Sequence, residues 1–292
     1  PMKALSGFTV LDLSTIVSDP FCTQMLSDMG ADIIKVEPVS GDPTRSWGPP
    51  FIGNESPYFI SVNRGKKSLA LNLNHAQGLN ILIKLIKKCD VLVENFKPDR
   101  KVKYGITYQK VKNLNPKIIH LSITGFGNNL SPTQNIPALD LTMQALTGIM
   151  SVTGPKDKEE PVRIGVAWLD VLTGLTGCSG ILSALIQLSR SCEGQYIDLS
   201  LFDVALMSSI NIGETFLLTG KVPRRLGSEH PQIVPYQAFK SRDYWFALAA
   251  ITEKQYTRLV KLLSPSSLDD NKIFATNSER VRNRDQLISI LG

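Results

Sequence analysis

The sequence predicts an α/β fold, with a Rossmann-like parallel sheet in a large domain and a smaller α+β domain behind it. Short β-branched segments alternate with segments whose apolar residues recur at helical spacing, which is typical of a doubly wound sheet. A stretch rich in proline, glycine and polar residues then separates this alternation from the end of the 292-residue chain. We therefore place the large domain at residues 1–221, and the linker and partial small domain at 222–292.

Five segments have the length and composition of buried strands. They are Phe8 to Leu13, Asp32 to Val36, Ser68 to Leu73, Asp90 to Phe96 and Lys117 to Thr124. The apolar residues between them share helical faces, and we expect these faces to cover the sheet: Phe21, Met25, Leu26 and Met29 in one segment, and Leu79, Leu82, Ile83 and Ile86 in another. Asp19 and Pro20 are typical of an N-cap and a first helical turn, and Gly30 of a helix end.

A long helix is predicted from about Asp170 to Leu188. Its glycines, Gly174, Gly177 and Gly180, would allow close packing against a neighbouring helix. A phosphate-binding loop is disfavoured at these glycines, because no strand leads into them. Beyond the linker at 223–239, the segment Tyr244 to Ile251 and a helix around Tyr256 to Leu263 form the smaller unit.

Composition excludes several classes of function. The charge of +6 (32 basic minus 26 acidic residues) suits an anionic small ligand, and the basic runs are too short and interrupted for a nucleic-acid arm. Three histidines and four cysteines without a CxxC pair predict no metal site and indicate reduced thiols in an intracellular compartment. No apolar run reaches the roughly 18 residues that indicate a membrane span, so we expect no membrane partner.

Two common interpretations of such a fold do not fit the motifs. The segment after the first strand, Ser14 to Pro20, has no GxGxxG, so the glycines that let a pyrophosphate approach the backbone are missing. The glycine-flanked serine of a GxSxG hydrolase does not occur either.

Several short segments, in this order, resemble CoA-transferase family III. Each is weakly diagnostic alone, but the ordered set is specific: Gly7 to Leu13, Gly30 to Glu37, Gly41 to Arg45, Asn63 to Ser68, Val93 to Phe96, Ser122 to Gly127, Asp140 to Ala145 with Gly148, and His230 to Tyr236. The segments Trp47 to Phe51 and Ile233 to Phe239 are most similar to the branch that uses succinyl-CoA and glutarate.

The resemblance implies that Asp140, in its Asp-x-x-x-Gln-Ala setting, is the catalytic nucleophile. Its carboxylate would attack the thioester of an acyl-CoA and carry the acyl group and then CoA through anhydride and thioester intermediates. Taken alone, an aspartate ahead of Leu141, Ala145 and Gly148 is also typical of a helix N-cap. The two roles are compatible, because a helix N-terminus stabilises an ionised carboxylate.

The resemblance also implies where CoA would bind, as a substrate and not as a permanently bound cofactor. The expected contacts are the loop at Val17 and Ser18, the strand end at Asn95 and Phe96, and the basic residues Arg64, Lys67 and Lys103. Lys66 offers further charge for the phosphates. Backbone N–H groups of the turn at Gly125 and Gly127 are candidates for an oxyanion site, although this is equally the pattern of a strand-ending turn.

For the whole protein, the resemblance implies an interlaced homodimer, a short dicarboxylic acid such as glutarate as acceptor, succinyl-CoA as donor, and a mitochondrial setting. Family members are longer, and their C-terminal segment returns from the small domain to the large one. This chain stops at Gly292 inside the small domain. We therefore expect weakened dimerisation or poor solubility for the 292-residue chain.

Three departures from the family pattern keep alternatives open. Ser18-Asp19-Pro20 replaces Ala-Gly-Pro, Lys97-Pro98-Asp99 replaces a glycine-rich turn, and Asn128 to Pro132 replaces Gly-Gln-Thr-Gly-Pro. One alternative is an α-methylacyl-CoA racemase, whose aspartate follows a histidine, whereas Leu139 precedes Asp140 here. The other is an inactive CoA-binding paralogue, for which the bulky Asp19 and the early end of the chain are the indications.

Overall fold

The computed structural model describes residues 3–128, 136–263, 268 and 272–292, and the chain forms two compact units. Unit 1 comprises residues 1–147 and 164–214, and unit 2 comprises 148–163 and 215–292. The predicted division had a single boundary after residue 221. The observed division differs because the segment at 148–163 leaves unit 1 and joins the second unit before the chain returns.

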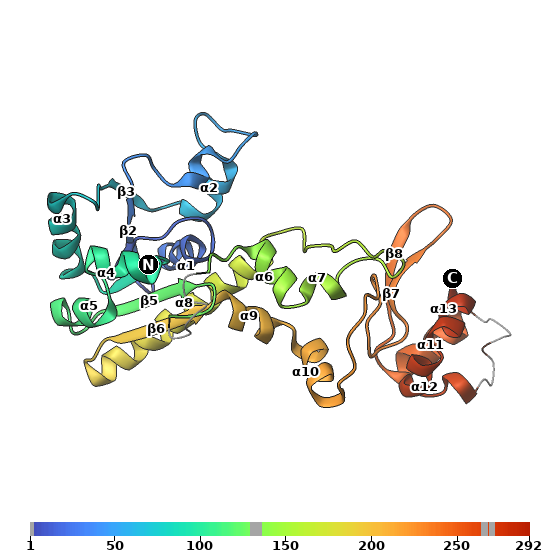
Figure 1. Ribbon diagram of the computed structural model, residues 1–292. Helices are drawn as coiled ribbons and strands as arrows, with labels where there is room; N and C mark the ends of the chain where they lie inside the picture. The colour runs from blue at the N-terminus through green and yellow to red at the C-terminus, as the bar shows by residue number, and fades with distance from the viewer. Residues whose placement is uncertain (1–2, 129–135, 264–267, 269–271) are drawn as a thin grey trace. The chain divides into compact units, whose positions relative to one another are not determined.

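Unit 1 is built on a six-stranded parallel sheet in the order β3-β2-β1-β4-β5-β6, which confirms the predicted α/β class (Figure 1). Five strands were predicted; the sixth was missed because its residues are only half buried and show no long apolar run. The strands are β1 (Thr9–Asp12), β2 (Asp32–Glu37), β3 (Lys67–Ala70), β4 (Val91–Glu94), β5 (Ile119–Thr124) and β6 (Gln195–Ser200).

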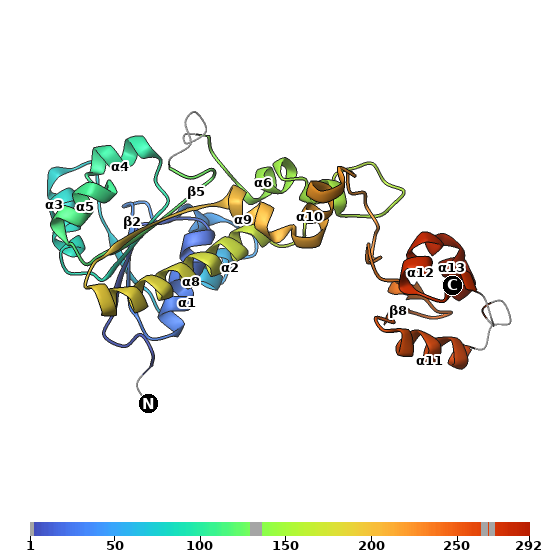
Figure 2. The ribbon, with the colours of Figure 1, turned by 90° about the horizontal axis from the view of Figure 1, so that it is seen from below.

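Helices cover both faces of this sheet, as Figure 2 shows, with α1 and α8 on one side and α3, α4 and α5 on the other. On the second side Leu82 and Ile86 of α3 pack with Val111 of α5 against Leu11 and Leu92 of the sheet. The helices of unit 1 are α1 (Ser18–Asp28), α2 (Pro57–Asn63), α3 (Ala76–Ile86), α4 (Pro98–Tyr104), α5 (Tyr108–Leu114), α6 (Asp140–Leu146), α8 (Trp168–Ser191) and α9 (Leu201–Ser208), with a 3₁₀ turn η1 (Pro43–Ser46).

The glycines of α8 allow the close packing predicted for them. A Cβ at Gly174 would lie 2.5 Å from the carbonyl oxygen of Ser18 in α1, and one at Gly177 would lie 3.0 Å from Leu121 in β5. By length and composition α8 is also apolar enough to cross a membrane. Leu169 and Ile181 are nevertheless fully buried inside unit 1, as in the core helix of a folded domain.

Unit 2 contains a two-stranded antiparallel sheet and three short helices around an apolar cluster of Val234, Tyr256, Phe274 and Leu287. The predicted linker ends earlier than expected, because its last residues already form the first strand. The elements are α7 (Ile149–Val152), β7 (Tyr236–Lys240), β8 (Trp245–Ala249), α11 (Glu253–Leu263), η3 (Lys272–Phe274), α12 (Asn277–Arg282) and α13 (Arg284–Leu291); α10 (Ile210–Thr219) crosses the boundary of the units.

Candidate active site

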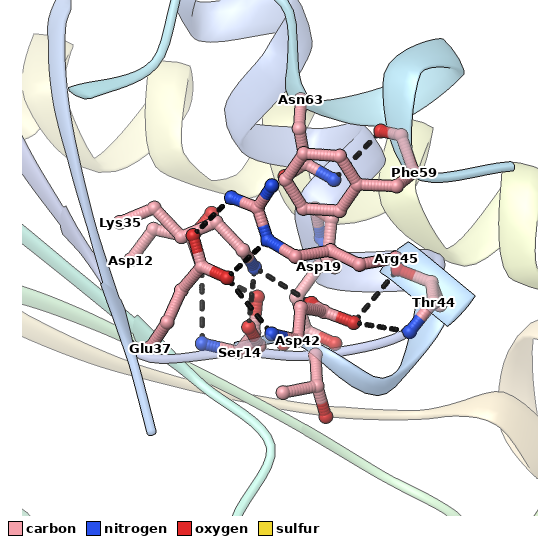
Figure 3. Close-up of polar contacts among 12 residues, drawn as sticks. Asp12, Ser14, Asp19, Lys35, Glu37, Asp42, Thr44, Arg45, Phe59 and Asn63 are labelled. Atoms are coloured by element: carbon pink, nitrogen blue, oxygen red, sulfur yellow. Dashed lines mark hydrogen bonds and ion pairs between the residues drawn. The ribbon is translucent and has the colours of Figure 1, made fainter. Parts of the chain in front are cut away.

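A buried ionic network fixes the loop that follows β1. The carboxylate of Asp12, at the end of β1, accepts hydrogen bonds from the hydroxyls of Ser14 (2.5 Å) and Thr23 (2.6 Å), and pairs with Lys66 at 3.1 Å (Figure 3). Burial alone would raise the pKa of Asp12, but Lys66, Lys35 and these hydroxyls together hold it well below its usual range. The anion is therefore permanent, and it ties the loop to α1.

A second part of the network holds the loop after β2. Arg45 pairs with Glu37 at 2.7 Å and stacks 3.8 Å over the ring of Phe59, while Lys35 pairs with Asp42 at 3.0 Å (Figure 3). Burial opposes ionisation of Glu37, yet its bonds from Arg45 and Ser68 lower the pKa to about 2. These contacts fix the backbone that forms one wall of a large cavity.

This larger cavity, of about 1080 Å³, lies at the carboxyl ends of β1, β2 and β4. Ligands of doubly wound sheets bind at this edge of the sheet. Asn95 and Phe96, which were predicted to contact CoA, line this cavity, and Phe96 packs edge-on against Tyr104 at 5.4 Å. The remaining wall is mostly apolar, with Val36, Val39, Leu71 and Leu73 among its residues.

The basic residues predicted for CoA binding are not gathered there. Arg64 pairs with Asp28 and Lys67 with Asp32, both on the exposed surface, and neither lines the larger cavity or the smaller one beside it. Lys66 is buried in the ion pair with Asp12, so its charge is not available to a phosphate. Lys103 reaches the rim indirectly, through a 2.7 Å bond to Asn74, which does line the larger cavity.

Two basic residues that sequence reasoning did not select do line the larger cavity, namely Lys97 and Arg100 at the start of α4. Their only sequence signal was the replacement of a glycine-rich turn by Lys97-Pro98-Asp99. That substitution was interpreted as a departure from the family pattern, although it places positive charge at the cavity.

A smaller cavity of about 300 Å³ adjoins the larger one and shares four residues with it, Thr15, Asn95, Phe96 and Lys97. The predicted residues Val17, Ser18, Gly125 and Asp140 all line it. Two aspartates that were not predicted as site residues, Asp19 and Asp170, line it as well. The structure thus brings three carboxyl groups to one small cavity.

Asp140 is the first residue of α6, whose N-cap is Leu139, so the interpretation of Asp140 as the cap of its own helix is wrong. Its carboxylate instead accepts from the N–H groups of Leu169 (2.9 Å) and Asp170 (3.5 Å) in the first turn of α8. The other oxygen accepts from the amide of Gln144 at 2.6 Å, which explains the spacing of the Asp-x-x-x-Gln motif. Both oxygens of Asp140 are thus engaged, and they stabilise the start of α8.

Asp170 lies in the first turn of α8 and is nearly buried. Its Oδ1 accepts a 2.6 Å hydrogen bond from the hydroxyl of Ser18, while Oδ2 accepts none from the residues that the structure describes. Burial raises the pKa of Asp170 to about 6. The hydrogen bond from Ser18 opposes this increase, whereas the negative charge of Asp140 adds to it. Asp170 lies at a predicted helix start and belongs to no motif that was identified. The sequence therefore did not distinguish it from an ordinary residue of a helix N-terminus.

Asp19 is also placed differently from the prediction. Helix α1 begins at Ser18 after Val17, so Asp19 lies inside the first turn and not at the N-cap. Its side chain is only 1% exposed.

The two glycines of the predicted oxyanion turn differ in position. Gly125 lines the smaller cavity, and a Cβ there would lie 2.5 Å from Ala138, so the backbone approach requires glycine. Gly127 has a φ of +84° and donates its N–H to Thr124, and it lines neither cavity. The following departure, at 129–132, lies outside the described residues, whereas Asn128 is bound to Asp198.

No group of three or more His, Cys, Asp and Glu side chains is placed to hold a metal ion within the described part of the chain.

Comparison with known proteins gives the family. Residues 5–292 match the family model described as CoA-transferase family III. The chain belongs to CoA-transferase family III. Among curated relatives, succinyl-CoA:glutarate CoA-transferase of Mus musculus is 40% identical over 292 residues, which is 100% of this chain and 66% of the relative. Succinate–glutarate CoA-transferase of Agrobacterium fabrum is 40% identical over 295 residues and is covered to 73%.

Solved structures of the family have the same fold. A CAIB/BAIF family protein from Brucella suis superposes with a TM-score of 0.86 and 40% identity, covering 100% of this chain and 78% of that protein. The chain spans about two thirds of the length of the mouse family member. Family membership and fold are thus established for this chain.

Proposed function

We propose that this protein transfers CoA from an acyl-CoA donor to a free carboxylic acid, and that an aspartate of the smaller cavity is the nucleophile. The observation that carries the proposal is the junction of the two cavities. The larger one has a volume and a largely apolar lining that suit a nucleotide, with Lys97 and Arg100 in its wall beside Glu37 and Asp99, and the smaller one presents Asp140 and Asp170 next to it. A thioester at the junction would place its carbonyl carbon beside these carboxylates.

The steps balance without any other reagent. An aspartate carboxylate attacks the thioester carbonyl, the C–S bond breaks, and CoA leaves as a thiolate, so that a mixed anhydride of the aspartate and the donor acid is formed. The thiolate then attacks the aspartyl carbonyl, which releases the donor acid and leaves CoA on the aspartate. The acceptor carboxylate repeats the exchange in reverse, so that acceptor-CoA leaves and the aspartate is restored.

The hydrogen bonds favour Asp170 over the predicted Asp140 as the attacking group. Both oxygens of Asp140 are held by α8 and Gln144, whereas Asp170 keeps one oxygen that accepts no bond from a described residue. In this proposal Asp140 positions the first turn of α8, and with it the nucleophile. Asp140 is the alternative nucleophile, and mapping of the covalent adduct separates the two assignments.

For the substrates we propose succinyl-CoA as donor and a short dicarboxylate such as glutarate as acceptor. The support is the activity for which the mouse and Agrobacterium relatives, each 40% identical to this chain, are named. A homodimer and a mitochondrial setting, which the family resemblance implies, are proposed as well.

The test is to incubate the protein with succinyl-CoA and a panel of free acids, and to follow new acyl-CoA by chromatography. We expect glutaryl-CoA to form from glutarate. Exchange of an α-proton with deuterated solvent, without new acyl-CoA, would instead identify a racemase, and the absence of both reactions would identify a CoA-binding paralogue. Equal rates with monocarboxylates would overturn the choice of acceptor.

A further inference from the structure

The strained loop, residues 15–18 between β1 and α1, contains a backbone outlier. Ile16, which lines the smaller cavity, has a φ of +75°, in the left-handed region that β-branched residues rarely adopt. Such a conformation persists only where the surrounding structure fixes it from several sides. The contacts on either side of Ile16 should therefore be those that hold the loop.

Before Ile16, the side chain of Asn95 binds the backbone of Thr15. Its Nδ2 donates to the carbonyl oxygen of Thr15 at 2.9 Å, and its Oδ1 accepts from the N–H of Thr15 at 3.4 Å. Nδ2 also donates to Oδ2 of Asp19 at 3.3 Å. Because Asn95 directly follows β4, these bonds attach the strained loop to the sheet. Both N–H donors of the amide are thus used within the protein.

After Ile16, the hydroxyl of Ser18 binds the proposed nucleophile, with a 2.6 Å bond to Oδ1 of Asp170. Both side chains are buried, so water does not readily replace this bond. The charged groups that face Asp170 are Asp140 from α6 and Asp19 from α1. Neither is a cation, so among the described residues the hydroxyl of Ser18 is what favours the ionised form of Asp170.

We propose that Asn95 is a positioning residue, whose amide holds the strained loop in the conformation that presents the hydroxyl of Ser18 to Asp170. The inference rests on the proposed function for the role of Asp170 as nucleophile. It differs from the CoA contact predicted for Asn95, because the amide has no N–H donor left for a ligand. Without the bonds from Asn95, Ile16 can relax to a negative φ. Ser18 then no longer reaches Asp170.

The strain is tested by comparing alanine and glycine at position 16. Both remove the isoleucine side chain, but alanine keeps the Cβ that disfavours the left-handed region. We expect the folded-to-unfolded ratio, measured by urea denaturation, to be about two- to tenfold higher in Ile16→Gly than in Ile16→Ala. Val39, which is 74% exposed in the loop after β2 and has a negative φ, is the control, and there the alanine variant should be the more stable. The same order at both positions would contradict the proposal.

The positioning role is tested by the pKa of Asp170, which infrared difference spectra measure without turnover. Spectra with and without Asp170→Asn, recorded over a range of pH, give the midpoint at which this carboxyl group ionises. Asn95→Ala is expected to raise the midpoint by about one pH unit, as for the loss of a hydrogen bond to a charged group. Ser18→Ala should raise it at least as much. The double variant should go no further than Ser18→Ala, because both changes remove the same bond.

Asn115→Ala is the matched control. The amide of Asn115 also donates to two backbone carbonyls, those of Ile86 and Cys89, but it lies at the end of α5. This variant should leave the midpoint of Asp170 unchanged. An unchanged midpoint in Asn95→Ala, or shifts that add in the double variant, would overturn the proposal. If Asn95→Ala does not fold, Asn95→Leu replaces it, since leucine keeps the volume but cannot donate.

Turnover then separates this inference from the proposed function. If Asn95 positions Asp170, the rise of kcat/KM with pH moves in Asn95→Ala together with the infrared midpoint. If Asn95 contacts CoA instead, KM for succinyl-CoA increases while the midpoint stays in place, which would contradict the proposal. Midpoints that shift as expected in a protein that transfers no CoA would refute the proposed function alone.

Discussion

Ser18 joins the loop after β1 to the first turn of α8, because its hydroxyl donates to the carboxylate of Asp170 at 2.6 Å. That bond favours the ionised form of Asp170, while burial opposes it and raises the pKa to about 6. An aspartate must be ionised to attack a thioester, so the reactivity of the site depends on this balance.

The first prediction concerns pH. Since the pKa of Asp170 is raised to about 6, its anionic fraction grows as the pH increases through that value, and kcat/KM for CoA transfer should rise over the same range and then level off. Ser18→Ala removes the bond that lowers the pKa, so the rise should move to higher pH. Ser61→Ala, an exposed serine of α2, is the control; a rise at the same pH in Ser18→Ala would contradict the assignment.

The second prediction concerns the buried ion pair of Lys66 and Asp12. Lys66→Met leaves the carboxylate of Asp12 buried without its cation, which should lower the free energy of unfolding by about 3–5 kcal/mol. Lys67→Met breaks the exposed pair with Asp32 and should cost about 1 kcal/mol or less. Urea denaturation of both variants measures the difference, and equal losses would show that the buried pair is not structural.

At the scale of elements, the strands were predicted where β-branched residues form compact runs, as in Asp32 to Val36. The edge strand β6 was missed because the residues of Gln195–Ser200 are only partly buried.

The site residues could also be predicted only in part from the sequence. Asp140 was selected because its Asp-x-x-x-Gln-Ala setting resembles the family motif, and the structure shows that Gln144 of this motif bonds to it. Asp170 is brought to the cavity by tertiary packing of α8, which no motif indicates. Sequence also could not show that Lys66 points inward while Arg64 and Lys67 point to solvent.

The third prediction tests the packing of α8 on α1. Gly174→Ala places a Cβ 2.5 Å from the carbonyl oxygen of Ser18, which cannot move without shifting α1. We expect a loss of about 1–3 kcal/mol in the free energy of unfolding, as for other overpacked cores. Gly180→Ala meets only ordinary contacts with Ile197 and should be neutral or stabilising by up to about 1 kcal/mol. A destabilisation of equal size in both variants would contradict this account.

For the whole molecule, the most exposed apolar side chains of the described residues include Leu217 and Leu218 in α10, each 76% exposed. Apolar surface of this kind is typical of a protein contact. It agrees with the proposed homodimer.

The fourth prediction follows from that surface. Leu217→Ser combined with Leu218→Ser should raise the soluble concentration of the 292-residue chain and lower its sedimentation-average mass, with little change in the urea midpoint. Ser substitutions at Lys221 and Lys240, which are exposed but polar, form the control. Unchanged self-association in the leucine double variant would show that α10 is not a contact surface.

The central claim is that an aspartate of the smaller cavity becomes covalently linked during transfer, and mapping the adduct tests it most directly. The protein is mixed with succinyl-CoA, quenched, and digested for peptide mass spectrometry, with Asp170→Asn and Asp140→Asn treated in parallel. We expect an acyl or CoA adduct on Asp170 that disappears in Asp170→Asn, together with a fall in turnover of several orders of magnitude. In Asp140→Asn the adduct should persist at a reduced rate, because an amide still accepts from α8. An adduct on Asp140 would restore the assignment made from sequence, and wild-type transfer by both variants would contradict the covalent mechanism.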